Sequence, residues 1–249
     1  MGAILETRSL TKTFGALTAA ADLNVRIEEG TRVGLIGGNG AGKTTFLNLV
    51  TGYLLPTAGE IRFDGREITG LSPRKITRQG ICRSFQIPQV FDSLSAYQNV
   101  LVALGIAARE KREAEAAAND TLHRFRLAPF RDAPASQLPE GVRKLLDIAL
   151  ALVVKPRLLL LDEPTSGVSA DEKFGLMDLV LAAIGAERVT VVFVEHDMEI
   201  VRRYAERVIA FYDGRTIADG PAAEVLDDPA VRRYVVGEPA PIAPKESAC

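Results

Sequence analysis

One eight-residue segment, from Gly37 to Thr44, strongly constrains what this chain can fold into. It reads Gly-Gly-Asn-Gly-Ala-Gly-Lys-Thr, which matches the pattern of a phosphate-binding loop. An apolar run at 31–36 precedes it and a second run at 45–50 follows it. A strand, a loop and a helix therefore come in the order that such a loop requires. The segment predicts a strand–loop–helix unit that binds a nucleoside triphosphate.

The residue types in this loop indicate how it would hold phosphate. Glycines let backbone N–H groups approach an anion closely, and the N-terminus of the following helix adds positive partial charge. Lys43 is expected to reach the terminal phosphates, and the hydroxyl of Thr44 is expected to bind Mg²⁺. The predicted nucleotide-binding residues of this segment are Gly37, Gly38, Asn39, Gly40, Ala41, Gly42, Lys43, Thr44 and Thr45.

Composition and charge argue against several other classes of protein. The 249 residues carry a net charge of −2, so no nucleic-acid partner is expected. The N-terminus does not resemble a signal peptide, and no stretch approaches the roughly 20 apolar residues that span a bilayer. Cys82 and Cys249 are expected to be reduced thiols in a cytosolic protein. The densest basic stretch is irregularly spaced and is expected to be a solvated face; it comprises residues 62, 66, 74, 75, 78 and 83.

The pattern along the chain predicts an α/β core with an antiparallel element near the N-terminus and a helical insertion from about 90 to 156. Hairpins are expected about Asp64-Gly65 and Asp213-Gly214, the strongest short hairpin signals present. Continuous apolar runs suit parallel strands that are covered on both faces. The expected strands include 23–27 after a turn at 13–15, and then 80–86, 158–161 and 189–194. The expected helices are 96–108, 109–126 and 145–154.

Two of the buried strands end in polar residues that suit phosphate chemistry. The run at 158–161 is followed by Asp162 and Glu163, and the run at 189–194 is followed by Glu195, His196 and Asp197. Because the carboxyl ends of parallel strands meet at the ligand crevice, these side chains are expected at one edge of the sheet. There Asp162 would face Mg²⁺ and Glu163 would act as general base for the attacking water. His196 would bind the γ-phosphate and position that water.

The order of these motifs resembles the nucleotide-binding subunit of ABC transporters. The resemblance covers about residues 4–236 and includes Phe85-Gln86, a helical insertion, Asp162 to Gly167 and Glu195 to Asp197. It implies a P-loop NTPase of the ABC type, with an N-terminal antiparallel β-subdomain and a helical subdomain insertion. In that division, 1–93 and 157–236 form the core with the β-subdomain, 94–156 forms the helical subdomain, and 237–249 is a flexible tail.

The resemblance also implies roles that the residues alone do not. Phe14 looks like the aromatic residue that stacks on adenine, and Gln86 looks like the glutamine that contacts Mg²⁺ and the attacking water and senses a transmembrane partner. His196 resembles the switch histidine of the family. The implied catalytic residues are therefore Glu163, His196 and Gln86, and the implied metal ligands are Thr44, Gln86 and Asp162. In this family, two such domains enclose two ATP molecules, and each lends a signature loop to its partner's nucleotide.

The chain departs from the family pattern at that signature loop. The corresponding residues are Leu138, Pro139, Glu140, Gly141 and Val142, in place of the usual Leu-Ser-Gly-Gly-Gln. Pro139 supplies neither the serine hydroxyl nor an N–H group, and Glu140 is expected to bring a carboxylate near the partner's γ-phosphate. Ser169 stands where an aspartate is usual. The hypothesis is that this chain's own ATP site is competent but that the signature it lends is poor.

Several local stretches resemble the ATPases of branched-chain amino-acid importers. They are 49–53, 56–59, 80–86 and 228–237. This resemblance implies a second ATPase subunit, two permeases, a periplasmic binding protein and a place at the cytoplasmic face of the inner membrane. The substrates of that family also include amides, urea and small organic acids. Two alternatives remain open: the ATPase of a lipopolysaccharide-type exporter, and a soluble ABC ATPase of the iron–sulfur assembly type. A DNA-repair ATPase is disfavoured, because the insertion of some sixty residues has no sustained heptads.

Overall fold

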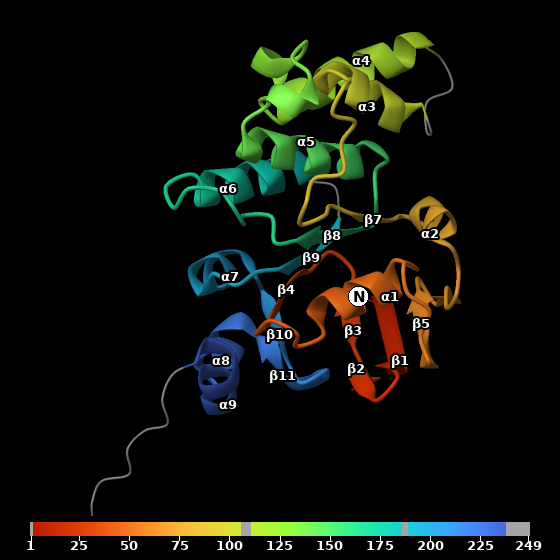
Figure 1. Ribbon diagram of the computed structural model, residues 1–249, viewed down its shortest axis with the longest axis vertical. Helices are drawn as coiled ribbons and strands as arrows, with labels where there is room; N and C mark the ends of the chain where they lie inside the picture. Colours follow the sequence, from red (N-terminus) through yellow and green to blue (C-terminus); the bar gives the residue numbers. More distant parts are fainter. Residues whose placement is uncertain (1, 106–110, 186–188, 238–249) are drawn as a thin grey trace, which may run out of the picture.

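A six-stranded sheet forms the centre of the molecule in the computed structural model, which describes residues 2–105, 111–185 and 189–237 (Figure 1). The strand order is β11-β10-β4-β9-β8-β7, and every pairing is parallel except β10 with β11. The strands are β4 (Arg32–Gly37), β7 (Ile81–Arg83), β8 (Leu158–Asp162), β9 (Thr190–Val194), β10 (Arg207–Tyr212) and β11 (Arg215–Pro221).

A smaller antiparallel sheet lies beside this core and is built around one long strand. Its first half pairs with β3 and β5, and its second half pairs with β2. The Asp64-Gly65 turn joins β5 to β6, as expected, because both residues adopt the positive φ that such a turn requires. The strands are β1 (Ala3–Phe14), β2 (Leu17–Leu23), β3 (Arg26–Glu28), β5 (Ala58–Phe63) and β6 (Arg66–Glu67).

The helices of the 94–156 insertion lie at the opposite end of the molecule from this antiparallel sheet (Figure 1). Ser95 and Gln98 form a capping box that begins α3, because each side chain bonds the backbone N–H of the other. The elements here are α3 (Ala96–Leu104), α4 (Lys111–Arg124), the short turns at Ala128–Phe130 and Ala135–Gln137, and α5 (Glu140–Val153). The remaining helical elements are α1 (Lys43–Val50), α2 (Pro73–Gln79), α6 (Lys173–Ile184), α7 (Met198–Tyr204), α8 (Ala222–Asp227), α9 (Pro229–Val231) and a π-helical turn at Arg232–Val236.

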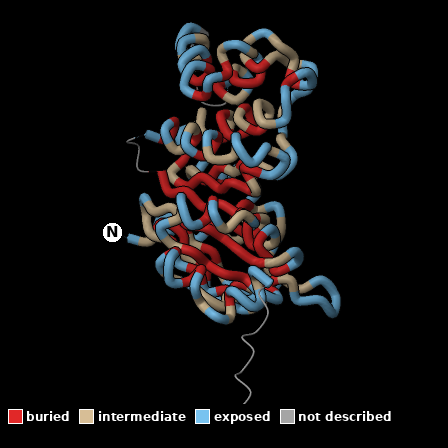
Figure 2. Tube along the Cα trace, turned by 90° about the vertical axis from the view of Figure 1, so that its left-hand side faces the viewer, coloured by how far each residue is buried: buried red, intermediate tan, exposed pale blue. Residues whose placement is uncertain are grey.

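Both faces of the central sheet are covered, which explains its uninterrupted apolar strands. In β8, Leu158 and Leu160 pack into a core shared with α1 and the antiparallel sheet. Leu159 and Leu161 point to the other face and pack with α5, α6 and α7. Buried residues accordingly run through the middle of the molecule, with exposed residues around them (Figure 2). The α/β class and the helical insertion are confirmed.

Some expected boundaries were wrong. The first turn lies at 15–16 rather than 13–15, because β1 continues through Phe14. The expected strand at 23–27 is divided, since β2 ends at Leu23 and β3 begins at Arg26. The strand expected at 80–86 is only β7, because the residues after Arg83 leave the sheet to contact α5 and the end of β8. The expected helix at 96–108 ends at Leu104; residues 106–110 and most of the expected tail, 238–249, lie outside the described residues.

Candidate functional site

The phosphate-binding loop connects β4 to α1 and depends on glycine where the chain passes closest to β2. Gly42 has a φ of +105°, and a Cβ atom there would lie 2.7 Å from the carbonyl oxygen of Ala19. No side chain fits at this position without moving backbone. The N–H of Gly214, in the β10–β11 turn, also donates to the carbonyl of Ala41 at 3.1 Å. The loop is therefore held from two sides in one conformation.

Lys43 is folded back into this loop. Its Nζ donates to the carbonyl oxygens of Gly37, at 2.6 Å, and Gly38, at 3.0 Å. Burial lowers the pKa of the ammonium group, an effect that the nearby carboxylates of Glu163 and Asp162 oppose. Since its hydrogen-bond partners are neutral carbonyls, an anion in the loop would be a stronger partner than those it holds. The cradle and its buried cation fit a phosphate group.

The other predicted nucleotide-binding residues of the loop differ in their exposure. Asn39, Gly40 and Thr44 are exposed, Thr45 is half-buried and Ala41 is buried. The ring of Phe14 is 47% exposed, at the end of β1 on the hairpin that carries Ala19. The ammonium of Lys12 lies 5.0 Å from the centre of that ring. Phe14 is therefore accessible to a flat ligand.

The three predicted catalytic side chains meet at one carboxylate. Gln86 donates through Nε2 to Glu163 Oε2 at 2.8 Å, and His196 Nε2 lies 2.8 Å from Glu163 Oε1. They come from the segments after β7, β8 and β9, whose carboxyl ends share one sheet edge. Glu163 has a left-handed backbone, with φ of +50°, a strained conformation for a residue with a side chain. Asp197 caps α7 by accepting hydrogen bonds from the N–H groups of Glu199 and Ile200. This cap fixes the backbone next to His196.

Asp162 is held by a residue that the sequence analysis placed on a solvated face. The guanidinium of Arg83 donates through one nitrogen to Asp162 Oδ2 at 2.5 Å and through another to Asn48 Oδ1 at 2.6 Å. The Arg83 side chain is only 5% exposed. The solvated-face prediction was therefore wrong for Arg83, because this residue ends β7 at the same sheet edge as Asp162. That shared edge was the signal that could have revealed it.

The sequence analysis also missed two buried ionic side chains on α5. Asp147 accepts the N–H groups of Phe85 and Gln89, each at 2.9 Å. Burial raises the pKa of Asp147 to about 6, although these two hydrogen bonds oppose the change. Lys144 donates to the carbonyl oxygen of Glu163 at 3.1 Å and to that of Ser166. Charged residues inside an apolar helix pattern were the available signal.

Glu195 supports the same loop from the end of β9. It is buried, and its Oε1 accepts both the N–H and the hydroxyl of Thr165, at 2.9 and 2.7 Å. Burial raises the pKa of Glu195, and the hydrogen bonds from Thr165 oppose this rise. The loop after Glu163 is thus held by α5 on one side and by the end of β9 on the other.

The predicted signature residues lie at the start of α5. Leu138 is buried, Pro139 and Glu140 are exposed, and Gly141 and Val142 are half-buried. Pro139 precedes the helix and provides no side-chain cap. The carboxylate of Glu140 lies against Gly167 of the same chain, since a Cβ at Gly167 would be 2.2 Å from Glu140 Oε1. Ser169 donates to Glu172 Oε2 at 2.7 Å.

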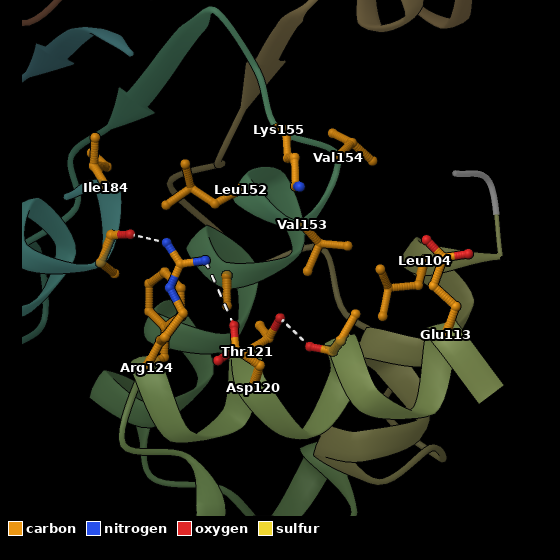
Figure 3. A pocket seen from close by; sticks show the side chains of 14 residues that line it. Leu104, Glu113, Asp120, Thr121, Arg124, Leu152, Val153, Val154, Lys155 and Ile184 are labelled. Atoms are coloured by element: carbon orange, nitrogen blue, oxygen red, sulfur yellow. Dashed lines mark hydrogen bonds and ion pairs between the residues drawn. The ribbon is translucent and has the colours of Figure 1, made fainter. Parts of the chain in front are cut away.

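A separate cavity of about 390 Å³ lies among α4, α5 and α6 (Figure 3). The guanidinium of Arg124, on α4, donates to the carbonyl oxygen of Ala183 on α6 and so joins two of its walls. The hydroxyl of Thr121 donates a hydrogen bond to the carbonyl oxygen of Ala117 at 2.8 Å. The described residues that line this cavity include no predicted site residue. It is therefore a feature of the helical insertion and lies outside the candidate site.

The donor set at the sheet edge fits a divalent cation held together with phosphates. Thr44, Gln86 and Asp162 offer hydroxyl, amide and carboxylate oxygens, which are the ligands of Mg²⁺. Within the described residues, no three His, Cys, Asp or Glu side chains cluster as a metal site. Of the three predicted ligands only Asp162 is one of these residue types, so a magnesium ion that takes its other ligands from Thr44, Gln86, phosphate and water is compatible with this finding.

Fold and site define a phosphate-loop nucleotide-binding protein whose helical insertion supports the loop after β8. The sequence profile of ABC transporters matches residues 20–166, and the chain belongs to the ABC transporter family. Members of this family hydrolyse ATP, so the chain is an ATPase.

Relatives and solved structures agree with this assignment. The chain is 37% identical to BraF of Pseudomonas aeruginosa, a high-affinity branched-chain amino acid transport ATP-binding protein, over 94% of this chain and 98% of BraF. It is 32% identical to LptB of Acidithiobacillus ferridurans, a lipopolysaccharide export system ATP-binding protein, over 96% and 98%. The ADP conformation of MJ1267, an ATP-binding cassette, superimposes with a TM-score of 0.84 at 28% identity, covering 96% of this chain and 100% of MJ1267. A dimeric post-hydrolysis cassette, MJ0796 bound to ADP and Pi, superimposes with a TM-score of 0.79 at 28% identity, covering 88% and 98%.

No helix among the residues that the structure describes is both long and apolar enough to cross a membrane.

Proposed function

We propose that this chain hydrolyses Mg²⁺-ATP to drive an importer for branched-chain amino acids or for related amides and organic acids. The observation that carries the catalytic part is the convergence of Gln86 and His196 on the two oxygens of Glu163. The transport part rests on the similarity to BraF, whose identity of 37% exceeds the 32% of LptB. This difference favours the importer over the lipopolysaccharide-type exporter.

The geometry suggests how the residues divide the reaction. Lys43 binds the terminal phosphates, and Phe14 stacks on the adenine ring. Glu163 accepts a proton from the water that attacks the γ-phosphorus, while the bond to the β-phosphate oxygen breaks and ADP leaves. His196 holds Glu163 in place through Nε2, and the same N–H would turn to the γ-phosphate once the nucleotide is bound. Mg²⁺, held through Thr44, Gln86 and Asp162, would neutralise charge on the phosphate oxygens.

A groove next to Gln86 supports a permease partner. It has a volume of about 230 Å³ and lies between the Tyr53–Phe85 pair and α5, with Asp147 and Leu150 in its wall. Ile87 and Phe91, which follow Phe85 closely in the sequence, are 74% and 56% exposed. Large apolar side chains gathered on one surface are typical of a protein-binding site. We assign this groove to a permease segment at the cytoplasmic face of the inner membrane, where movement would reach Gln86 directly.

A second ATPase subunit follows from the signature loop. The dimeric MJ0796 cassette supports pairing of two ATPase chains, and the family resemblance implies that the start of α5 would face the nucleotide of the partner. Because Pro139 and Glu140 make this loop a poor phosphate ligand, a different partner chain is favoured over a second copy of this one. The composite site completed by the partner's signature would then do most of the hydrolysis.

The decisive experiment is purification of the chain with its candidate permeases in detergent, followed by reconstitution with a periplasmic binding protein. Leucine-stimulated ATP hydrolysis and leucine uptake that both disappear in Glu163→Gln would support the proposal. If no membrane protein co-purifies and the chain alone shows full ATPase activity, a soluble ABC ATPase is the better assignment. Stimulation by lipopolysaccharide instead of an amino acid would favour the exporter.

A further inference from the structure

The buried guanidinium of Arg83 joins three parts of the molecule that the proposed reaction must keep in register. It bonds Asp162 at the end of β8 and Asn48 on α1, at 2.5 and 2.6 Å. Its Cζ lies 5.0 Å from the centre of the Phe85 ring, on the groove side. Phe85 in turn packs edge-on against Tyr53, with ring centres 5.7 Å apart.

Asn48 gives this bridge a direct relation to the magnesium site. It lies four residues after Thr44 on α1, so both side chains are on the same face of that helix. Arg83 therefore connects the helix that carries the Thr44 hydroxyl to the strand that carries the Asp162 carboxylate. Two donors on one rigid, planar group determine the separation between these two predicted oxygen ligands.

The hydrogen bonds of Arg83 are arranged to join two elements rather than to satisfy all of its own donors. Its Nε is buried and has no hydrogen-bond partner in the described part of the chain, which is a cost to stability. A guanidinium that served only to neutralise Asp162 would gain by turning its Nε to an acceptor. The observed orientation instead directs two nitrogens to two different elements.

We propose that Arg83 is a positioning residue that sets the spacing of Asp162 and Thr44 for Mg²⁺. Only one oxygen of Asp162 is used by Arg83, so the other remains available to the hydrated ion.

Arg83→Lys and Asn48→Leu test the proposal in the full-length chain. Arg83→Lys keeps the positive charge, but a single ammonium nitrogen cannot reproduce the fixed two-donor bridge between β8 and α1. Asn48→Leu leaves the Arg83–Asp162 pair intact while removing the link to α1. The probe is adenylyl imidodiphosphate, a non-hydrolysable ATP analogue, whose binding is measured by calorimetry at increasing Mg²⁺ and again in EDTA. Arg78→Lys, on the exposed face of α2, is the matched control.

We expect both test variants to need about tenfold more Mg²⁺ for half-maximal tight binding, the loss of one charge-assisted hydrogen bond. Binding in EDTA should stay within about twofold of the wild type, because the phosphate loop is untouched. A parallel loss with and without Mg²⁺ would mean a general structural role and would overturn the proposal. So would a silent Asn48→Leu beside an affected Arg83→Lys, since that pattern shows that the link to α1 does not set the spacing.

The inference rests on the proposed magnesium site, and the two can fail separately. If binding by the wild-type chain does not respond to Mg²⁺, the magnesium site and the positioning role are both wrong. If the wild type responds and the two variants respond identically to it, only the role of Arg83 is wrong.

Discussion

His196 Nε2 lies 2.8 Å from Glu163 Oε1, although the two residues are 33 positions apart in the chain. With the Glu163 carboxylate ionised, the imidazole must be the donor, which leaves the Glu163 Oε2 to Gln86. One carboxylate thus receives a fixed orientation from two neighbouring loops.

Replacement of Glu163 by Gln should nearly abolish ATP hydrolysis in the assembled transporter, by a factor of about 10² to 10⁴, because the amide cannot accept the proton of water. ATP binding should persist, since Lys43 and the glycine loop are unchanged. Phosphate release under single-turnover conditions measures the first effect, and calorimetry measures the second. His196→Ala should also reduce turnover. His123→Ala, on the exposed side of α4, is the control for that variant. Undiminished turnover in Glu163→Gln would exclude Glu163 as the base.

Replacement of Gly42 by Ala should disrupt the phosphate loop, because the new Cβ would lie 2.7 Å from the Ala19 carbonyl at a φ of +105°. We expect a loss of about 1–3 kcal/mol in the free energy of unfolding and a strong loss of ATP affinity. Gly38→Ala is the matched control, since a Cβ there meets nothing within 4 Å. Urea denaturation and nucleotide titration check both variants. Equal effects at the two positions would refute the steric argument.

The Asp147 carboxylate should make coupling sensitive to acid. Its pKa of about 6 means that it becomes protonated as the pH falls through 6, and one of its two acceptor oxygens then becomes a hydroxyl. The segment from Phe85 to Gln89 would lose one anchor, so permease-stimulated ATPase activity should decline below about pH 6. Asp147→Asn, which has a single acceptor oxygen at every pH, should show the lowered stimulation throughout. A wild-type-like pH profile in Asp147→Asn would show that the anchor is not limiting.

The same pKa change has an opposite consequence for stability. The folded chain binds a proton at Asp147 at a higher pH than the unfolded chain does, so ionisation disfavours the folded state. Relative to Asp147→Asn, the wild type should therefore lose unfolding free energy as the pH rises from about 4 to 6, on the order of 3 kcal/mol, with little change above that. Denaturant titrations of both proteins across this range measure the difference. A wild type that gains stability relative to the variant would have the wrong sign.

The signature loop offers a gain-of-function experiment. Pro139→Ser with Glu140→Gly restores a hydroxyl, an N–H group and a small residue at the start of α5. In the proposed heterodimer, hydrolysis at the partner's site should rise roughly fivefold, because a carboxylate expected near the γ-phosphate has been removed. The assay compares the ATPase activity of the assembled complex with and without the two substitutions, while the catalytic residues of the partner chain are left unchanged. Unchanged hydrolysis would remove support for the idea of a poor signature.

The sequence alone was sufficient for the parts of the site whose chemistry is local. The phosphate loop needs closely spaced glycines followed by Lys43 and Thr44. Asp162, Glu163 and His196 each follow an apolar strand, and the ends of parallel strands meet at one sheet edge. The α/β class followed from the same patterns. These features depend on short-range spacing, which a sequence displays directly.

What tertiary structure decided is which buried charges support that chemistry. Arg83 stands among basic residues with no pattern of their own, and only the pairing of β7 with β8 places it against Asp162. Asp147 and Lys144 lie in an apolar helix pattern, and only the packing of α5 brings them to Phe85 and Glu163. A buried charge is stable only beside a specific partner, and those partners are about 20 to 80 residues away in the chain. The phosphate loop could therefore be predicted from the sequence, whereas the buried charges that align it with Glu163 could be identified only from the tertiary structure.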